Sequence, residues 1–272
     1  EQMLPDEIRS YKLTVQERGD QTETIQGTDI SIRPQFGDSI AEKIRTQNSF
    51  AWPAAFFSSK EIEEETVVEF DEDALRQKMK DLDCMQAANQ KEPKDAYCSD
   101  YVNGGYEIIP EEEGSTLMES QVFSVLEDAV GNLTEEVSLE KEDCYKKPSV
   151  TAETQSLKDL VDTLNRYVQA KITYKAGDKT EVLDKDTIHT WLKVSGTQVS
   201  IDEDAVSEYM TKLASVFNTA FKGHSLKTSY GTTVQIPNGD YGWKIDKDKE
   251  KEQLLSEIKE GKQTEREPVY AQ

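Results

Sequence analysis

The first third of the chain alternates polar and apolar positions and then changes to a helical period. Residues 11–17 and 24–32 alternate on either side of Arg18-Gly19-Asp20, a pattern that predicts a β-hairpin. A short helix is expected from Asp38 to about Gln47. Residues 67–70 predict a strand that leads into a helix, whose apolar face would consist of Ala74, Leu75, Met79 and Leu82.

A second hairpin and a second helix complete the first half of the chain. Residues 95–109 predict a hairpin that turns at Asn103-Gly104-Gly105. Thr116 and Glu119 have the spacing of a capping box, so we expect a helix to begin there. Gly131 would end that helix.

The helical period returns after residue 155. An amphipathic helix is predicted there, with its inner face formed by Leu157, Leu160, Val161, Leu164 and Val168. Strands at 172–174 and 199–201 are expected next, with a short helix around 188–192 between them. A longer helix would follow, with Val206, Tyr209, Met210, Leu213 and Phe217 on its inner face.

The C-terminal part predicts one more hairpin and a final helix. Residues 232–236 and 241–245 flank Pro237-Asn238-Gly239-Asp240, and Asn-Gly favours a tight turn because it tolerates positive φ. The last helix should run from about Lys247 to Glu260 and end at Gly261.

One segment in the first half of the chain resembles a segment in the second half. Residues 70–82 align without gaps on residues 201–213, and in both an acidic run begins a helix. Internal duplication explains this, and so does convergence, because carboxylates stabilise any helix N-terminus. The mixture of strands, hairpins and helices predicts an α+β fold with two domains, 1–150 and 151–272. Each would be an antiparallel or mixed sheet with helices packed on one face.

Charge and composition restrict the classes of molecule that the chain is expected to bind. The chain has 32 basic and 54 acidic residues and a formal net charge of −22. Such a charge repels phosphate groups, so we expect no binding of nucleic acid or of an anionic membrane. It also favours a soluble monomer. No apolar run approaches the roughly 20 residues of a membrane span, so direct membrane insertion is not expected.

The cysteines and histidines predict neither a metal site nor a cofactor site. There are three cysteines and two histidines, with no Cys-x-x-Cys pair. The acidic clusters lack the spacing of a calcium loop, and helix capping explains two of them. In an extracellular protein two cysteines could pair, and we favour Cys84 with Cys144, leaving Cys98 free. Three unpaired thiols are the alternative.

Several motifs occur in an order that resembles a known family. The C-terminal region contains Gly239-Asp240-Tyr241-Gly242-Trp243, then an acidic helix and Arg266-Glu267-Pro268-Val269-Tyr270. Residues 106–111 read Tyr-Glu-Ile-Ile-Pro-Glu and precede Gly114 and Leu117. This series is similar to the peptidoglycan-binding region that leads into the YkuD-type catalytic domain of L,D-transpeptidases, the cysteine enzymes that cross-link peptidoglycan.

The resemblance implies an accessory role without catalysis. The family's catalytic motif places a cysteine after Ser-His-Gly, whereas Cys84, Cys98 and Cys144 do not follow a His-Gly pair. The implied partners are peptidoglycan and a C-terminal catalytic domain. The implied location is the wall of a Gram-positive-type cell, outside an upstream membrane anchor. Two alternatives stay open: a VanW-associated type of wall or glycopeptide-resistance module, and a carboxylate-dependent peptidoglycan hydrolase.

Aromatic residues near the C-terminus are the candidate glycan contacts. Tyr230, Tyr241 and Trp243 belong to the predicted last hairpin, and Tyr241 and Trp243 would share a face because they are two residues apart. Sugar rings stack on such platforms. The alternative is that these rings form the core face of the hairpin.

Overall fold

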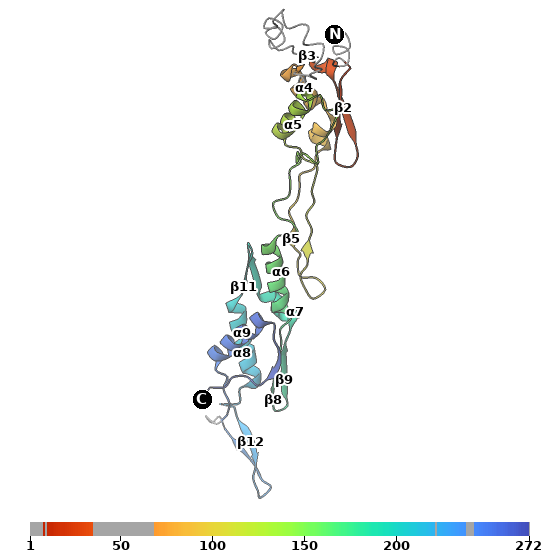
Figure 1. Ribbon diagram of the computed structural model, residues 1–272. Coiled ribbons are helices and arrows are strands. Elements are labelled where there is room, and N and C mark those ends of the chain that lie inside the picture. Colours follow the sequence, from red (N-terminus) through yellow and green to blue (C-terminus); the bar gives the residue numbers. More distant parts are fainter. Residues whose placement is uncertain (1–7, 9, 35–67, 221, 238–241, 272) are drawn as a thin grey trace, which may run out of the picture. The chain divides into compact units, whose positions relative to one another are not determined.

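The computed structural model describes residues 8, 10–34, 68–220, 222–237 and 242–271 (Figure 1). The chain forms two compact units, the first from Glu1–Lys94 with Glu112–Pro148 and the second from Asp95–Glu111 with Ser149–Gln272. Both mix helices with small sheets, which confirms the predicted α+β class. The expected division at residue 150 assigned 95–111 to the first domain, whereas the structure groups these residues with the second unit.

The first unit contains a three-stranded mixed sheet in the order β2-β1-β7. β1 (Lys12–Gln16) and β2 (Thr22–Gln26) form the predicted antiparallel hairpin, with Gly19 and Asp20 at positive φ in its turn. β7 (Glu136–Ser138) lies parallel to β1 on its other edge.

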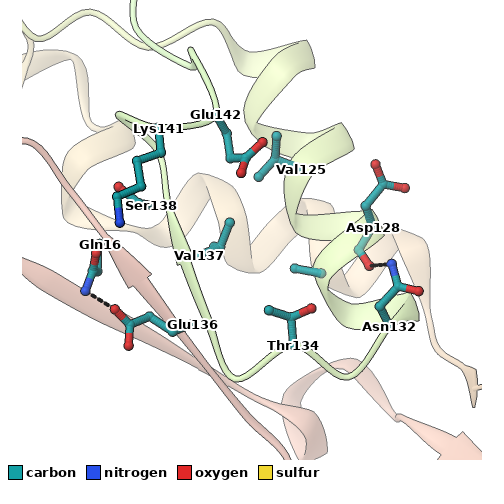
Figure 2. A pocket seen from close by; sticks show the side chains of 11 residues that line it. Gln16, Val125, Asp128, Asn132, Thr134, Glu136, Val137, Ser138, Lys141 and Glu142 are labelled. Carbon is teal, nitrogen blue, oxygen red and sulfur yellow. Dashed lines mark hydrogen bonds between the residues drawn. The ribbon is translucent and has the colours of Figure 1, made fainter.

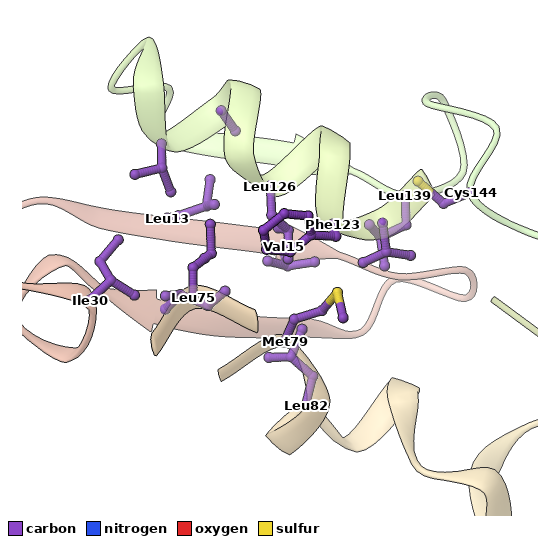
Figure 3. Packing of buried hydrophobic residues seen from close by; sticks show 14 of the residues in the cluster. Leu13, Val15, Ile30, Leu75, Met79, Leu82, Phe123, Leu126, Leu139 and Cys144 are labelled. Carbon is purple, nitrogen blue, oxygen red and sulfur yellow. The ribbon is translucent and has the colours of Figure 1, made fainter. Parts of the chain in front are cut away.

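Two helices pack against this sheet and enclose the core of the first unit. They are α4 (Glu72–Asp81) and α5 (Glu119–Gly131). Figure 3 shows the central strand's Leu13 and Val15, which are fully buried, among leucines from both helices. The remaining short elements of this unit are η1 (Gly27–Ile30), β3 (Arg33–Pro34), β4 (Val68–Glu69), η2 (Asp83–Met85) and η3 (Ala87–Asn89).

The predicted capping box of α5 is wrong. The N-cap residue is Met118, which makes no side-chain cap. Thr116 is buried, and its hydroxyl donates instead to the carbonyl of Lys91 at 2.9 Å, because a buried hydroxyl needs a partner. At the other end Gly131 is still helical, and Leu133 adopts the left-handed conformation.

The second unit repeats the mixed sheet, in the order β14-β8-β9. β8 (Lys171–Ala176) and β9 (Lys179–Leu183) form an antiparallel hairpin, and β14 (Gln263–Arg266) lies parallel to β8. Its helices and its other paired strands are α6 (Gln155–Val168), α7 (Lys185–Ile188), η4 (His189–Trp191), β10 (Leu192–Ser195), β11 (Gln198–Ile201), α8 (Glu203–Phe217) and α9 (Lys247–Glu260). Gly261 takes the left-handed conformation after α9, as predicted.

The 95–111 segment is fastened to α6. It contains the predicted hairpin of β5 (Tyr97–Cys98) and β6 (Ile108–Ile109). The side-chain amide of Asn165 accepts from Tyr106 N and donates to Tyr106 O, both at 2.8 Å. These two bonds and the apolar contacts of Ile108 with α6 explain why the segment belongs to the second unit.

The predicted hairpin of 232–236 with 241–245 is wrong. β13 (Thr233–Ile236) pairs instead with β12 (His224–Lys227), and the connection turns at Gly231, where φ is +79°. Ile245 forms its bridge with Tyr270. The Asn-Gly of the expected turn and the helix expected at 38–47 lie outside the described residues.

The two units share one order of elements. In each, a hairpin that contains the central strand is followed by a short 3-10 segment, a second antiparallel strand pair, two helices and a strand that returns parallel to the central one. The second unit adds α7 before its 3-10 segment and the β12–β13 pair between its two helices, and the first unit adds η2 and η3 after α4. Asp71 and Asp202 cap the first helix, and their backbone N–H groups donate to the last residue of the 3-10 segment, Ile30 O at 2.9 Å and Trp191 O at 2.7 Å. Convergence at a single helix start does not explain a shared topology, so we favour duplication.

Candidate functional site

The two C-terminal motifs lie against each other in the second unit. Residues 269–271 run antiparallel to 244–246: Asp246 N donates to Val269 O at 2.9 Å, and Ala271 N donates to Lys244 O at 2.8 Å. The rings of Trp243 and Tyr270 are consequently neighbours, with centroids 5.3 Å apart. We call these two residues the aromatic pair.

The backbone fixes the position of Trp243. Its N–H donates to Thr219 Oγ1 at 2.8 Å, and its carbonyl accepts from the N–H groups of Thr219 and Ala220. Gly242 has φ of +138°, and a Cβ there would lie 2.5 Å from Ala220 N, so only glycine fits this approach. The Trp243 side chain nevertheless remains 63% exposed. An anchored backbone thus presents an accessible ring.

The structure describes two of the three candidate glycan contacts, so the shared face of Tyr241 and Trp243 stays a prediction. Tyr230 lies in the turn between β12 and β13 and is 94% exposed. Trp243 is exposed too, so neither ring is a core residue. Tyr241 lies outside the described residues. Sequence reasoning missed Tyr270 as the partner of Trp243; the signal was the presence of both motifs in one family signature.

The second unit also contains a buried cluster of charged residues, which we call the charged cluster. Arg266 forms a bidentate pair with Glu250, Nη2 to Oε1 at 2.6 Å and Nη1 to Oε2 at 2.9 Å. Its Nε lies 3.1 Å from both carboxylate oxygens of Glu257. Tyr174 OH donates to Glu250 Oε1 at 2.7 Å, and Val269 N donates to Glu250 Oε2 at 2.7 Å. The cluster therefore joins β8, α9, β14 and the segment after β14.

Electrostatics favour the charged form of Arg266 and the neutral form of Tyr174 in this cluster. Glu250 is fully buried. Burial opposes the charge of Arg266, but hydrogen bonds to Glu250 and Glu257 and the negative surroundings raise the pKa of its guanidinium overall. Burial, and then the Glu250 carboxylate, raise the pKa of the Tyr174 phenol, so Tyr174 remains a hydrogen-bond donor.

All three thiols are free, and the favoured Cys84–Cys144 pairing is not formed. Cys144 Sγ donates toward Glu142 O at 3.7 Å and Cys98 Sγ toward Ser99 O at 3.4 Å. Cys84 Sγ lies among carboxylates instead, within 4.8 Å of oxygens of Glu17 and Glu23. His189, one of the two histidines, stacks on Tyr101 with centroids 4.0 Å apart.

Glu17, Glu23 and Cys84 form a cluster of residue types that can bind a metal. Hydrogen bonds within the protein explain why they lie together. The Glu23 carboxylate accepts from the backbone N–H groups of Asp83 and Cys84 at 2.8 and 3.1 Å. Burial, followed by the neighbouring Glu23, raises the pKa of Glu17. Burial and both carboxylates raise the pKa of Cys84. A thiol that retains its proton, as Cys84 does, is a poor metal ligand at neutral pH.

Thiol reactivity should separate the three cysteines. Burial, followed by Glu142 and Asp143, raises the pKa of Cys144 to about 11, and the pKa of Cys84 is raised too; a raised pKa means less thiolate at neutral pH. Burial, followed by Asp100, also raises the pKa of Cys98, but this side chain is only partly buried and so is accessible to the reagent. We expect iodoacetamide at about pH 7.5 to alkylate Cys98 at least about tenfold faster than the other two. Peptide mapping by mass spectrometry without reductant measures this, and a linked Cys84–Cys144 peptide would contradict the structure.

The first unit contains a groove between α5 and β7 (Figure 2). Its volume is about 350 Å³. We call it the α5–β7 groove, and it is lined by Gln16, Val125, Asp128, Ala129, Asn132, Thr134, Glu136, Val137, Ser138, Lys141 and Glu142. Its walls come from the continuous segment 125–142 and from Gln16 of β1, and no pattern in the sequence marked it.

Part of the chain is similar to a known family. Residues 151–266 match the family model described as "Putative peptidoglycan binding domain". The matched segment begins just before α6 and ends at Arg266, the residue at the centre of the charged cluster. A search of curated proteins finds no match.

Two solved structures of L,D-transpeptidases are similar to part of the chain. One is the Ldtfm carbamoyl enzyme formed with avibactam, with 29% identity over 42% of this chain and a TM-score of 0.38. The other is a cysteine-to-serine mutant of the Enterococcus faecium L,D-transpeptidase, with 27% identity over 43% of this chain and a TM-score of 0.36. Each match covers 46% of the solved chain, so this chain spans less than half of their length. Within the described ranges, no helix is long and apolar enough to cross a bilayer.

Proposed function

We propose that this chain is the non-catalytic, wall-binding and spacing region of an L,D-transpeptidase. The observation that carries the proposal is the family match over residues 151–266, together with the motifs at 106–117 and 239–270 in the order of that enzyme family. In this proposal the protein acts outside the cell at the wall, and an upstream transmembrane helix anchors it. A C-terminal catalytic domain with a cysteine nucleophile cross-links the stem peptides.

The charged cluster supports the spacing role. Arg266 ends β14, and Val269 N is bonded to the buried Glu250 carboxylate. The segment after Arg266 is thereby held in one direction as it leaves the domain. A spacer that positions an enzyme needs such a fixed exit, since a flexible one would spread the enzyme over a larger volume.

The aromatic pair supports the binding role and provides the test. We expect Trp243→Ala to weaken co-sedimentation of the chain with purified sacculi by about fivefold, since one aromatic contact is worth about 1 kcal/mol. Tyr97→Ala is the matched control, because Tyr97 is another exposed aromatic residue of the second unit. Its affinity should not change.

The results of the sedimentation experiment distinguish wall binding from the alternative functions. If the unmodified chain does not sediment with sacculi, peptidoglycan binding is wrong and spacing alone remains. If the chain sediments and Trp243→Ala does so equally, the aromatic pair is not the contact. Release of muropeptides by the chain would support the carboxylate-dependent hydrolase instead. A coding sequence that continues into a domain without a His-Gly-x-Cys motif would favour the VanW-associated module.

A further inference from the structure

The shared topology shows which positions of the two units correspond. In the first unit the buried Val15 of the central strand pairs with Val137, and in the second the buried Tyr174 pairs with Arg266. The second helices bury the same spacing of positions, Val122, Leu126, Ala129 and Val130 in α5 and Glu250, Leu254, Glu257 and Ile258 in α9. By this correspondence, Val137 takes the place of Arg266 and Ala129 the place of Glu257.

The two units differ at one pair of corresponding positions. In the second unit Arg266 extends between α9 and the sheet and contacts Glu257. In the first unit the smaller Ala129 and Val137 occupy these positions, and both line the α5–β7 groove, whereas Val15 and Val122 are buried in the core. The second unit thus shows that a long cationic side chain can lie between the strand and the helix beside the position that Ala129 takes in the first unit.

The groove has the chemistry for such an occupant. Val125, Ala129 and Val137 provide an apolar lining, and the carboxylates of Asp128, Glu136 and Glu142 surround it, with Lys141 the one cation among the lining residues (Figure 2). Glu136 accepts from the amide of Gln16, which orients it. An apolar lining suits the methylene stem of a lysine-like side chain, and a carboxylate rim suits its ammonium group.

We propose that the α5–β7 groove binds the diamino-acid side chain of a peptidoglycan stem peptide through its free amine. The choice of ligand rests on the proposed function, whereas the preference for a long cation rests on the groove. The site lies in the first unit, outside the segment that matches the family. The chain would then contact the wall at two places, a peptide at the groove and a glycan at the aromatic pair.

Nuclear magnetic resonance on the full chain tests this site. The probe is the tripeptide L-Ala-γ-D-Glu-L-Lys with an amidated C-terminus, titrated into ¹⁵N-labelled protein, and the comparison ligand is the same peptide with its lysine amine acetylated. We expect saturable shifts at the side-chain amides of Gln16 and Asn132. Acetylation should weaken binding about tenfold, because it removes the ammonium contacts with two carboxylates.

Matched variants locate the effect. Asp128→Asn with Glu136→Gln should weaken binding of the unmodified tripeptide about tenfold. Glu127→Gln with Glu135→Gln makes the same change of charge one residue away on the same two segments, outside the groove lining, and should leave the affinity unchanged. Equal loss in both pairs would indicate general electrostatic attraction and overturn the proposal.

Three further results would test the proposed amine-binding site. Equal binding of the acetylated peptide, or an absence of saturable shifts at the groove, would reject the amine-binding site. Shifts at the groove with chitotetraose and not with the tripeptide would assign it to glycan instead. Sacculus sedimentation is scored separately: if it persists in the Asp128→Asn, Glu136→Gln variant while the tripeptide fails to bind the unmodified chain, the wall-binding function stands and only the groove proposal is lost.

Discussion

Arg266→Ala is expected to lower the free energy of unfolding of the second unit by about 3–5 kcal/mol. The change leaves Glu250 and Glu257 buried without their cation, and Tyr174 OH and Val269 N cannot compensate two negative charges. The loss measures the cost of unpaired buried charge, not the net contribution of the pair. Urea denaturation followed by the fluorescence of Trp191, which is buried in the core of this unit, reports the change.

Two variants make this test specific. Lys175→Ala removes an exposed pair with Glu265 in the same sheet, 2.8 Å long, and should cost at most about 1 kcal/mol. Arg266→Met combined with Glu250→Gln and Glu257→Gln removes all three charges together and should recover most of the loss. If Arg266→Ala costs no more than Lys175→Ala, water reaches the cluster and the buried pair is not what holds the C-terminal segment.

Gly114→Ala should destabilise the first unit by about 2–5 kcal/mol, the combined cost of a strained backbone and a steric clash. Gly114 has φ of +68°, which costs a non-glycine residue roughly 1–2 kcal/mol. A Cβ there would also lie 2.5 Å from Lys91 O and 2.7 Å from Pro93 N, and relief of such overpacking costs roughly 1–3 kcal/mol. Lys91 O already accepts from Ser115 N and Thr116 N, so it cannot retreat freely. Thermal unfolding of the variant measures the effect.

Gly19→Ala is the control for the backbone contribution alone. Gly19 has φ of +86°, and a Cβ added there would meet no atom within 4 Å, so only the left-handed penalty of about 1–2 kcal/mol applies. A loss of stability in Gly114→Ala no larger than that of Gly19→Ala would show that the 91–93 segment can move aside. The glycine of the family signature at 106–117 would then lack the packing role we assign to it.

Local patterns predicted most elements of the fold. The Arg18-Gly19-Asp20 turn, the acidic caps at Asp71 and Asp202, and the stop at Gly261 all depend on residues that are neighbours in sequence. Such signals are visible without tertiary context. The predicted α5 cap failed because the hydroxyl of Thr116 bonds to Lys91 O, a partner 25 residues away that no local pattern reveals.

The site was harder to predict for the same reason. Trp243 was a candidate, but its neighbour Tyr270 is brought to it by pairing of 269–271 with 244–246. Glu250 and Glu257 were hidden among 54 acidic residues. Their signal was positional, because they share the inner face of α9 with Leu254 and Ile258, where carboxylates need a buried cation. Arg266 is that cation.

Residues 95–111 belong to the second unit although segments of the first unit precede and follow them in sequence. This arrangement affects what happens when a protease cuts the chain. The chain passes from one unit to the other at Lys94–Asp95, again at Glu111–Glu112 and finally at Pro148–Ser149. A protease that cuts any one of these junctions leaves the two halves covalently tethered through the others. Only after all three junctions were cut would the two halves be free to separate.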